Sequence, residues 1–299
     1  GLLGAEAFVG EHPWAKDVLI AINFEARGTS GPSLMFETGA SNGAVVREWA
    51  SVVPRPAGSS VTYEVYKRLP NDTDFSVFRR LGIPGLNFAF IGNWRGYHTP
   101  VDSPVRLDPG SLQHHGAAAL GLLQRFGAMD LAGIKERNAV FFSVPVLGRV
   151  VRYSTVWVLP LAGLAIIVFM WVTVSARRRL NTSIGGLLLG LVVWLVLGGL
   201  AGLWGYYFIR AIGRVHARWL SPGNTAISAP YGLALVMTIV TAGLLFYSVL
   251  RRKFAAQTLA LSGLCVCLLA TCAASWAVPG GSYVLLWPLV GGVLAVSQL

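Results

Sequence analysis

The chain has 299 residues, of which 54% are hydrophobic and only 12% are charged, and its mean hydropathy is +0.60. This composition excludes a disordered chain, a secreted disulfide scaffold and an ordinary soluble domain. The net charge of +11 is unevenly placed: all 13 Asp and Glu lie between Glu6 and Glu136, whereas residues 155–299 contain nine Lys and Arg and no acidic residue. Those positive residues alternate with long apolar runs, so they indicate membrane topology, and no nucleic-acid partner is expected.

The first 138 residues carry apolar runs of strand length that alternate with segments of helix length. Strands are expected at residues 18–24, 33–37 and 86–91. Helices are expected at residues 42–53, 59–69, 74–81 and 111–126, with Asp74 as the N-cap of the third. A mainly parallel sheet typically has more strands than these and needs cover on both faces. Residues 1–138 are therefore predicted to be part of an α/β domain whose beginning is absent from this chain.

The rest of the chain is predicted to be an interfacial linker, residues 139–154, followed by an all-α multispanning transmembrane region, residues 155–299. Its apolar runs predict about five helices, at about residues 155–174, 184–209, 231–250, 254–278 and 282–299. The three cysteines all lie in the fourth run. They are expected to be buried apolar side chains, because a metal site in lipid would need thiolates and further ligands.

The short loops between these helices predict the orientation of the chain. Arg177–Arg179 follow the first helix and Arg251–Lys253 follow the third, so these six positive residues share one side of the membrane. The other side has only Arg210, Arg214 and Arg218. The excess of positive charge favours the cytosol, which places the polar domain on the non-cytosolic side. The helices lack the ionisable residues that proton-coupled transporters use, which argues against a transporter, although a small neutral substrate would escape that argument.

Several polar residues have ordinary structural explanations. His114 and His115 are neighbours on a helix and lie about 100° apart, so they are expected at a solvated rim. His216 lies in an arginine-rich loop between two spans, where it could contact lipid headgroups. Asp72 and Asp74 fit a turn and an N-cap.

Glu25 and His98 stand out because each follows an expected strand. Ligands of open α/β sheets bind beyond the carboxyl ends of the strands, so both residues are well placed for chemistry. Asp102 lies four residues after His98 and could orient its imidazole, as carboxylates do for metal-bound histidines. Two structural alternatives remain open: Glu25 could form an ion pair with Arg27, and His98 could be a solvated loop residue.

Four segments occur in order at domain-scale spacing and resemble those of a known family. They are Gly1-Leu2-Leu3-Gly4-Ala5, Asn23-Phe24-Glu25-Ala26-Arg27-Gly28, Asn71-Asp72-Thr73-Asp74-Phe75 with Leu81-Gly82-Ile83-Pro84-Gly85, and Tyr97-His98-Thr99-Pro100-Val101-Asp102. As an ordered set they resemble the aminopeptidase-Y and glutamate-carboxypeptidase-like family of cocatalytic zinc peptidases. The likeness is to its membrane-spanning branch, the vacuolar membrane protease and endoplasmic reticulum metallopeptidase group, and covers about residues 1–127 and the trailing spans.

This resemblance implies a zinc-exopeptidase fold with a mixed central sheet and two zinc ions. The family holds the zinc ions with a His, a bridging Asp, a Glu, a further acidic residue and a final His. Glu25 matches the further acidic ligand, and His98 matches the final His. Tyr97 matches a tyrosine thought to stabilise the oxyanion, and Asp102 matches the acidic position after the His. The resemblance also suggests residues that line the substrate cleft: Arg27, Asp72 and Asp74.

The chain also departs from the family pattern. In the family, Gly-Leu-Leu-Gly directly follows a Glu-Glu pair that supplies the general base and a zinc ligand, and here the chain begins after the place of that pair. The chain is therefore expected to be a fragment at both ends, part of a membrane-anchored exopeptidase acting on peptides and inactive alone. The alternative is a non-catalytic membrane protein whose peptidase-like domain binds peptides or partners. The oligomeric state stays open.

Overall fold

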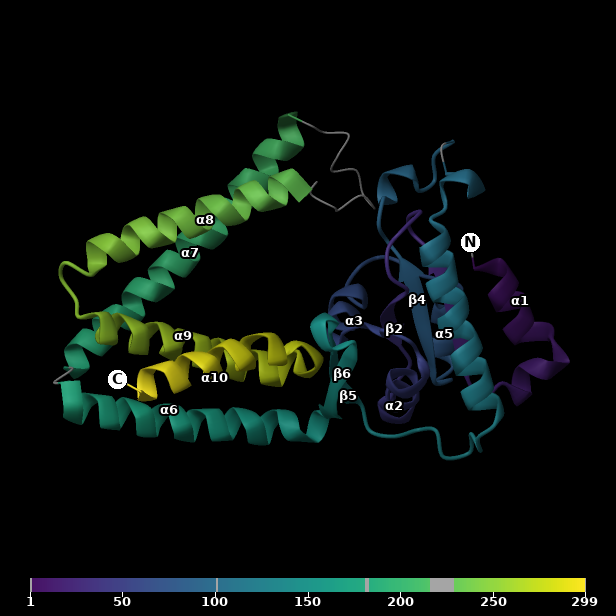
Figure 1. The fold of residues 1–299 in the computed structure, drawn as a ribbon, viewed down its shortest axis with the longest axis horizontal. Coiled ribbons are helices and arrows are strands. Elements are labelled where there is room, and N and C mark those ends of the chain that lie inside the picture. The colour runs from purple at the N-terminus through teal and green to yellow at the C-terminus, as the bar shows by residue number, and fades with distance from the viewer. Residues whose placement is uncertain (1, 101, 181–182, 216–228, 299) are drawn as a thin grey trace. The chain divides into compact units, whose positions relative to one another are not determined.

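The computed structural model describes residues 2–100, 102–180, 183–215 and 229–298. His216 and Arg218, for which the sequence predicts an interspan loop, lie outside the described residues. The chain divides into two compact units. The first comprises residues 1–160 and 274–283, and the second comprises residues 161–273 and 284–299. The ribbon of Figure 1 is coloured along the chain.

The first unit contains a four-stranded sheet in the order β1-β4-β2-β3. β1 is parallel to β4, β4 is antiparallel to β2, and β2 is parallel to β3, so the predicted mixed sheet is confirmed. Its strands are β1 (Ala21–Ala26), β2 (Leu34–Thr38), β3 (Ala57–Gly58) and β4 (Gly85–Phe90). Its helices are α1 (Leu3–Glu11), α2 (Gly43–Val52), α3 (Ser60–Tyr66), α4 (Asp74–Arg80) and α5 (Pro109–Gly127).

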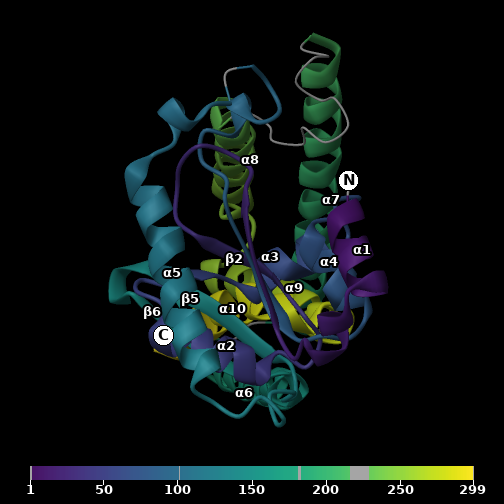
Figure 2. The same ribbon diagram turned by 90° about the vertical axis from the view of Figure 1, so that its right-hand side faces the viewer.

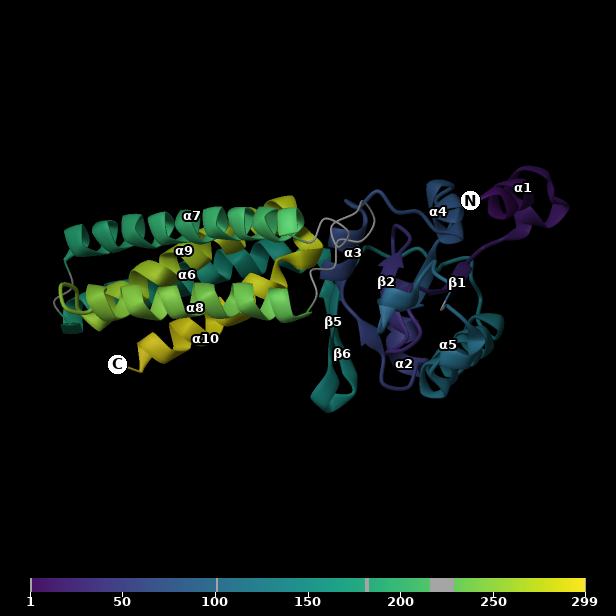
Figure 3. The same cartoon turned by 90° about the horizontal axis from the view of Figure 1, so that it is seen from above.

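The two faces of this sheet differ in chemistry. On one face Phe24, Phe88 and Met35 pack into the main core with side chains of α2 and α5. The other face, toward α3 and α4, carries polar side chains, because a β-bulge between Met35 and Glu37 turns Glu37 to that side. Figures 2 and 3 show the strands between α4 and α5. The sheet thus has an apolar face and a polar face, and the polar face carries the candidate site.

Residues 139–154 form a β-hairpin of β5 (Ala139–Val144) and β6 (Arg149–Ser154). The base of the hairpin belongs to the core of the first unit, since Val140 and Phe141 are fully buried. Phe141 joins the main core with Trp49, whereas Val140 packs with Val158 and Tyr283 in a smaller cluster. The segment predicted as a linker is thus an ordered part of the first unit.

The connection between the last two helices also belongs to the first unit. Helix α9 (Ala256–Ala277) is followed by a short 3-10 helix, Pro279–Gly281, and then by α10 (Tyr283–Ser297). Ser60 Oγ lies 2.5 Å from the carbonyl oxygen of Gly280 and accepts the N–H of Phe141 at 3.0 Å. A single hydroxyl at the start of α3 therefore joins this connection to strand β5.

The second unit contains helices long and apolar enough to span a membrane. Four spans satisfy these criteria in the described part of the chain: Thr155–Arg179, Ile184–Val215, Tyr231–Leu250 and Ala256–Ala277. They correspond to helices α6 (Val158–Leu180), α7 (Ile184–Val215), α8 (Ala229–Leu250) and α9. Helix α10 has 15 residues and is about 22 Å long, shorter than a bilayer core of about 30 Å.

The helices of this unit are unequally covered. Side chains of α6, α9 and α10, including Phe169, Leu261 and Leu289, form a buried apolar cluster. In contrast, only 6% of the residues in the most apolar 18-residue stretch of α7 are buried, and none are buried in that of α8. A hydrogen bond from Trp204 Nε1 to Thr238 Oγ1, 3.0 Å long, links α7 to α8. The surfaces of α7 and α8 are therefore suited to lipid or to further helices.

Candidate metal centre

The loops that follow β1 and β4 are joined by backbone hydrogen bonds. Arg27 N donates to Phe90 O at 3.0 Å, Thr29 N donates to Gly92 O at 3.0 Å, and Gly92 N donates to Ser30 O at 2.7 Å. A Cβ atom on Gly28 would lie 2.1 Å from Gly92 O, so only glycine fits this approach. Since β1 and β4 are parallel neighbours, the loop after Glu25 and the loop leading to His98 meet at one sheet edge.

Arg27, Tyr97 and His98 form a stack at this edge. The guanidinium carbon of Arg27 lies 5.5 Å from the centroid of the Tyr97 ring, and the rings of Tyr97 and His98 stack at 3.9 Å with an interplanar angle of 18°. His98 is exposed and has a φ of +56°, which is uncommon for a residue with a side chain. Such backbone strain concentrates at functional sites. The stack holds the imidazole of His98 at the surface.

The Glu25 carboxylate is held by an amide from its own strand. Asn23 Nδ2 donates to Glu25 Oε1 at 3.1 Å and also to Asn87 Oδ1 at 3.0 Å. In the described part of the chain, Glu25 Oε2 accepts no hydrogen bond and no ion pair joins Glu25 to Arg27. Glu25 therefore keeps one carboxylate oxygen available to a ligand.

A buried polar network extends from Asn23 across the sheet. Asn87 Nδ2 donates to Glu37 Oε2 and to Thr73 Oγ1, both at 2.8 Å, and Glu37 Oε1 lies 3.0 Å from Arg79 Nε. Burial raises the pKa of Glu37, although the hydrogen bond from Asn87 and the charge of Arg79 act in the opposite direction. The network connects Glu25 to an ion pair under α4. The sequence prediction missed it; its only signal was the polar residues inside or beside apolar runs.

Tyr66 is a further residue that the sequence prediction missed. Its hydroxyl is buried and has no hydrogen-bond partner among the described residues, and its ring packs edge-on against Phe36 at 4.7 Å. Burial, then the charge of Glu37, raises its pKa to about 12; Arg27 lowers it, whereas Asp72 and Glu25 raise it further. The charges of Arg27 and Glu25 at the candidate site therefore act on the Tyr66 hydroxyl of α3.

The three other acidic candidates lie at the surface. Asp72 pairs with Arg80 at 3.8 Å. Asp74 is the first residue of α4, and Thr73 occupies the N-cap, so the prediction that Asp74 caps this helix is wrong by one residue. Asp102 donates its backbone N–H to Thr99 O at 3.0 Å. No hydrogen bond joins Asp102 to His98 within the described residues, and the roles of Asp72, Asp74 and Asp102 stay predictions.

His115 is buried, and the prediction of a solvated rim is wrong for it. Its Nδ1 lies 2.5 Å from Ser33 Oγ and its Nε2 lies 3.0 Å from the backbone carbonyl of Glu25. His114 accepts the backbone N–H of Ser33 at 3.1 Å and lies 3.1 Å from Pro54 O. The pair therefore fastens α5 to the end of β1, to Ser33 in the β1–β2 loop and to Pro54 after α2.

The donor types at this sheet edge fit a zinc ion. Glu25 offers a carboxylate oxygen and His98 offers an exposed imidazole, and both are ligands that zinc takes. Within the described residues, no group of three or more His, Cys, Asp and Glu is arranged to hold a metal ion. Because zinc sites use at least three protein ligands, these two residues can supply only part of one.

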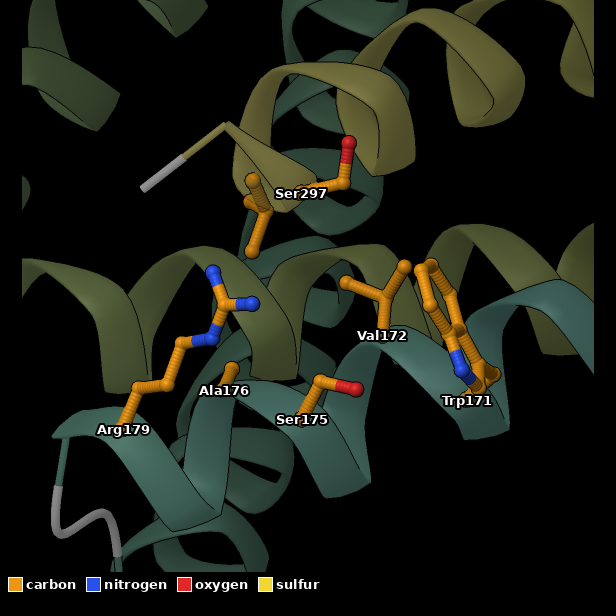
Figure 4. Close-up of a pocket in the computed structure, with 7 residues that line it drawn as sticks. Trp171, Val172, Ser175, Ala176, Arg179 and Ser297 are labelled. Atoms are coloured by element: carbon orange, nitrogen blue, oxygen red, sulfur yellow. The ribbon is translucent and has the colours of Figure 1, made fainter.

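A pocket in the second unit offers no alternative metal site. It lies where the C-terminal ends of α6 and α10 meet, as Figure 4 shows. Arg179 is its only charged lining residue, beside the hydroxyls of Ser175 and Ser297. None of its lining residues is a carboxylate, imidazole or thiol. The candidate chemistry therefore stays in the first unit.

Comparison with protein families gives a match for the part of the chain that contains this sheet. Residues 1–123, from α1 into α5, match the family model described as peptidase family M28. This part of the chain is therefore similar to peptidases of family M28. The M28 segment contains Glu25, His98 and the whole four-stranded sheet.

Curated relatives extend the similarity beyond the M28 segment. Over 150 residues the chain is 38% identical to endoplasmic reticulum metallopeptidase 1 of Homo sapiens, covering 48% of this chain and 17% of that protein. Over 126 residues it is 33% identical to putative endoplasmic reticulum metallopeptidase 1-A of Caenorhabditis elegans, covering 41% and 14%. Over 146 residues it is 32% identical to the vacuolar membrane protease of Yarrowia lipolytica, covering 48% and 14%. No solved structure matches the chain.

These relatives are the membrane-spanning branch that the sequence resembles, so that prediction is confirmed. The matched part of the chain spans less than a fifth of the length of each of them. Together with the four apolar helices, the similarity supports a multi-pass membrane protein with a peptidase-like segment.

Proposed function

We propose that this chain is part of a membrane-anchored zinc exopeptidase of the aminopeptidase type, which hydrolyses peptides on the non-cytosolic side. The observation that carries the proposal is the meeting of two loops of the M28 segment at one sheet edge. One loop begins just after Glu25, which keeps a free carboxylate oxygen, and the other presents His98 on the Arg27–Tyr97 stack. The M28 family and the names of the relatives support peptide hydrolysis.

Each residue of the edge has a role in this proposal. Glu25 and His98 would each supply one ligand to one of two zinc ions. When bound, such zinc ions lower the pKa of a water molecule and polarise the scissile carbonyl. Tyr97, which directly precedes His98, donates a hydrogen bond from its hydroxyl to the developing oxyanion. The guanidinium of Arg27 lies over the Tyr97 ring and holds it in place.

Catalysis would need two further kinds of group besides these residues: a general base and more zinc ligands. A carboxylate must accept the proton of the attacking water, and Glu25 is assigned to metal binding. Two ligands hold zinc weakly, because structural and catalytic zinc sites use three or four. We therefore propose that Glu25 and His98 act together with further ligands of the whole protein, and that residues 1–299 alone do not turn over substrate.

Charge and connectivity support a non-cytosolic location for the first unit, which contains the M28 segment and is called the peptidase unit below. Arg177–Arg179 lie in the last turn of α6 and Arg251–Lys253 follow α8, whereas only Arg210 and Arg214 follow the apolar part of α7 among the described residues. Four crossings by α6 to α9 return the chain to the side on which it started. The loop Pro279–Gly281 after α9 packs in the peptidase unit, as an even number of crossings requires. The positive-inside rule then assigns the opposite side to the cytosol.

The test is His98→Ala in the whole protein, with zinc content and aminopeptidase turnover measured together. We expect loss of one zinc and of turnover, with an unchanged circular dichroism spectrum, because a missing ligand opens the metal site without disturbing the sheet. His12→Gln is the control, since His12 is an exposed imidazole beside Trp14. Full zinc content and full turnover in the His98 variant would refute the assignment. Peptide binding without turnover in the unsubstituted protein would favour a non-catalytic peptide-binding protein.

A further inference from the structure

The base of the β5–β6 hairpin lies where helices leave the first unit. Val158 is the first residue of α6 and Tyr283 is the first residue of α10, and both pack against Val140 of β5. The ring of Phe142 stacks on the ring of Tyr283, with centroids 4.4 Å apart and an interplanar angle of 11°. Because α6 is a membrane-spanning helix, this end of the first unit must lie next to the bilayer.

The same face of the hairpin continues outward with apolar side chains that the protein does not cover. Side chains alternate between the faces of a strand, so Val140 and Phe142 share a face with Val144 on β5 and with Val151 and Tyr153 on β6. Val151, nearer the tip, is already 38% exposed. The base of this face is therefore buried, whereas its outer half is open.

The tip of the hairpin is the most exposed apolar part of this surface. The turn is Pro145–Leu147 followed by Gly148, and Val146 and Leu147 are 95% and 67% exposed. Arg149 is the first residue after the turn and lies on the same face as Val144. No acidic residue follows Glu136 in the sequence, so the charge of the hairpin is positive. Exposed aliphatic side chains beside an arginine are typical of segments at the boundary of headgroups and acyl chains.

We propose that the outer half of the β5–β6 hairpin docks on the lipid bilayer. Val146 and Leu147 enter the headgroup–acyl boundary, and Arg149 contacts lipid phosphates. The bilayer is the occupant because the buried base of the same face packs on the first residues of two helices, one of them a span. The hairpin thereby fixes the peptidase unit against the membrane surface. This proposal is independent of zinc binding and of hydrolysis.

The test places a probe at the tip and at a matched control position. Val146→Cys and Val105→Cys are made in full-length chain whose three native cysteines are replaced by Ala, and each is labelled with a nitrobenzoxadiazole fluorophore. Val105 is the control because it has the same side chain and the same exposure, 95%, in a 3-10 helix outside the hairpin. The proteins are reconstituted in phosphatidylcholine vesicles, with or without phosphatidylserine and with or without lipid carrying a doxyl quencher high on its acyl chain.

We expect the probe at residue 146 to emit at shorter wavelength than the probe at residue 105 and to lose at least about half of its emission in doxyl-lipid vesicles. Leu147→Asp in the Val146→Cys protein should restore most of that emission, and Arg149→Gln should remove any increase in quenching caused by phosphatidylserine. Equal emission and quenching at the two positions would overturn the proposal. A blue-shifted probe at residue 146 that lipid does not quench would also overturn it, since a second copy or another protein segment would then cover the tip.

Discussion

Asn87 shows how much of this molecule depends on one buried amide. It is fully buried at the centre of β4, accepts a hydrogen bond from Asn23, and donates to both Glu37 and Thr73. Its oxygen and both of its N–H groups are therefore used. A buried polar group that loses its hydrogen-bond partner destabilises the folded state. Networks of this kind therefore stabilise the fold only when they are complete.

We expect Asn87→Leu to lower the free energy of unfolding by about 3 kcal/mol or more, because it removes the hydrogen bonds to Asn23, Glu37 and Thr73, worth about 1 kcal/mol or more each. The measurement is chemical denaturation of the full chain in detergent. Asn71→Leu is the matched control, since Asn71 lies only partly buried in a loop and should change stability by less than about 1 kcal/mol. Equal effects of the two substitutions would mean that the network does not stabilise the sheet.

At the scale of single residues, the sequence predicts candidate residues at the ends of strands, but it does not predict which buried polar side chains form hydrogen bonds with one another. Glu25 and His98 could be singled out because each follows an apolar run, and they stay predictions as metal ligands. Asn23 and Asn87 could not be singled out, because an amide inside an apolar strand has no partner visible in the sequence. The partners lie 64 positions apart along the chain and meet only through the parallel pairing of β1 and β4.

At the scale of secondary structure elements, helices α2 and α5 are joined by an ion pair between the buried carboxylate of Glu48 and Arg125. Glu48 is 5% exposed in its side chain, and its carboxylate accepts hydrogen bonds from Arg125 at 2.6 Å and from Arg47 at 3.0 Å. Burial alone would raise the pKa of Glu48, but the hydrogen bonds from Arg125 and Arg47 outweigh burial and hold the pKa below its ordinary value of 4.5. A lowered pKa means that ionised Glu48 stabilises the folded state.

We expect Arg125→Met to lower the free energy of unfolding by about 1 kcal/mol near neutral pH, because Glu48 loses its shortest charged partner. This loss should shrink as the pH falls below 4.5 and through the lowered pKa, since protonated Glu48 no longer needs the guanidinium. Denaturation midpoints over a pH series measure it, and Arg137→Met, at an exposed arginine, is the control. A loss that is constant over the pH series would show that Arg125 acts through packing alone.

The regular elements were predictable where one pattern dominated. The runs at residues 18–24, 33–37 and 86–91 correspond to β1, β2 and β4 within three residues at each end. The β5–β6 hairpin was not predicted, because its apolar residues lead into arginines and then directly into a membrane-spanning helix. On α5, Leu122 and Phe126 are buried, whereas Leu112 and Leu123 are exposed, so an apolar residue within a predicted helix does not by itself indicate burial.

For the whole molecule, two independent observations support the proposed membrane topology. The positive clusters lie in the last turn of α6 and directly after α8, and the connection after α9 belongs to the first unit. Both fit the proposal that α6 to α9 cross the membrane four times. A transporter would be expected to carry ionisable side chains in its spans, and the apolar cluster of α6, α9 and α10 contains none.

We expect single cysteines at Ser183 and Lys253 to react with a membrane-impermeant maleimide from one side of sealed vesicles, and a cysteine at Asp130 to react from the other. All three positions are exposed, and the native cysteines are replaced by Ala. Ser183 and Lys253 lie at the ends of α6 and α8 that carry the positive clusters, so they should face the cytosol. Labelling of all three from one side would exclude the proposed crossings.

The small cluster of Val140, Val158 and Tyr283 has a consequence for biosynthesis. Val140 and Tyr283 are 143 positions apart, and the four spans lie between Thr155 and Ala277. At a synthesis rate of about 5–20 residues per second, Tyr283 leaves the ribosome on the order of 10 s after Val140. During that time Val140 lacks the side chain of Tyr283, against which it packs in the finished protein. The first unit therefore completes this cluster only after the four long apolar helices have been synthesised, so the end of its folding depends on the chain as far as Tyr283.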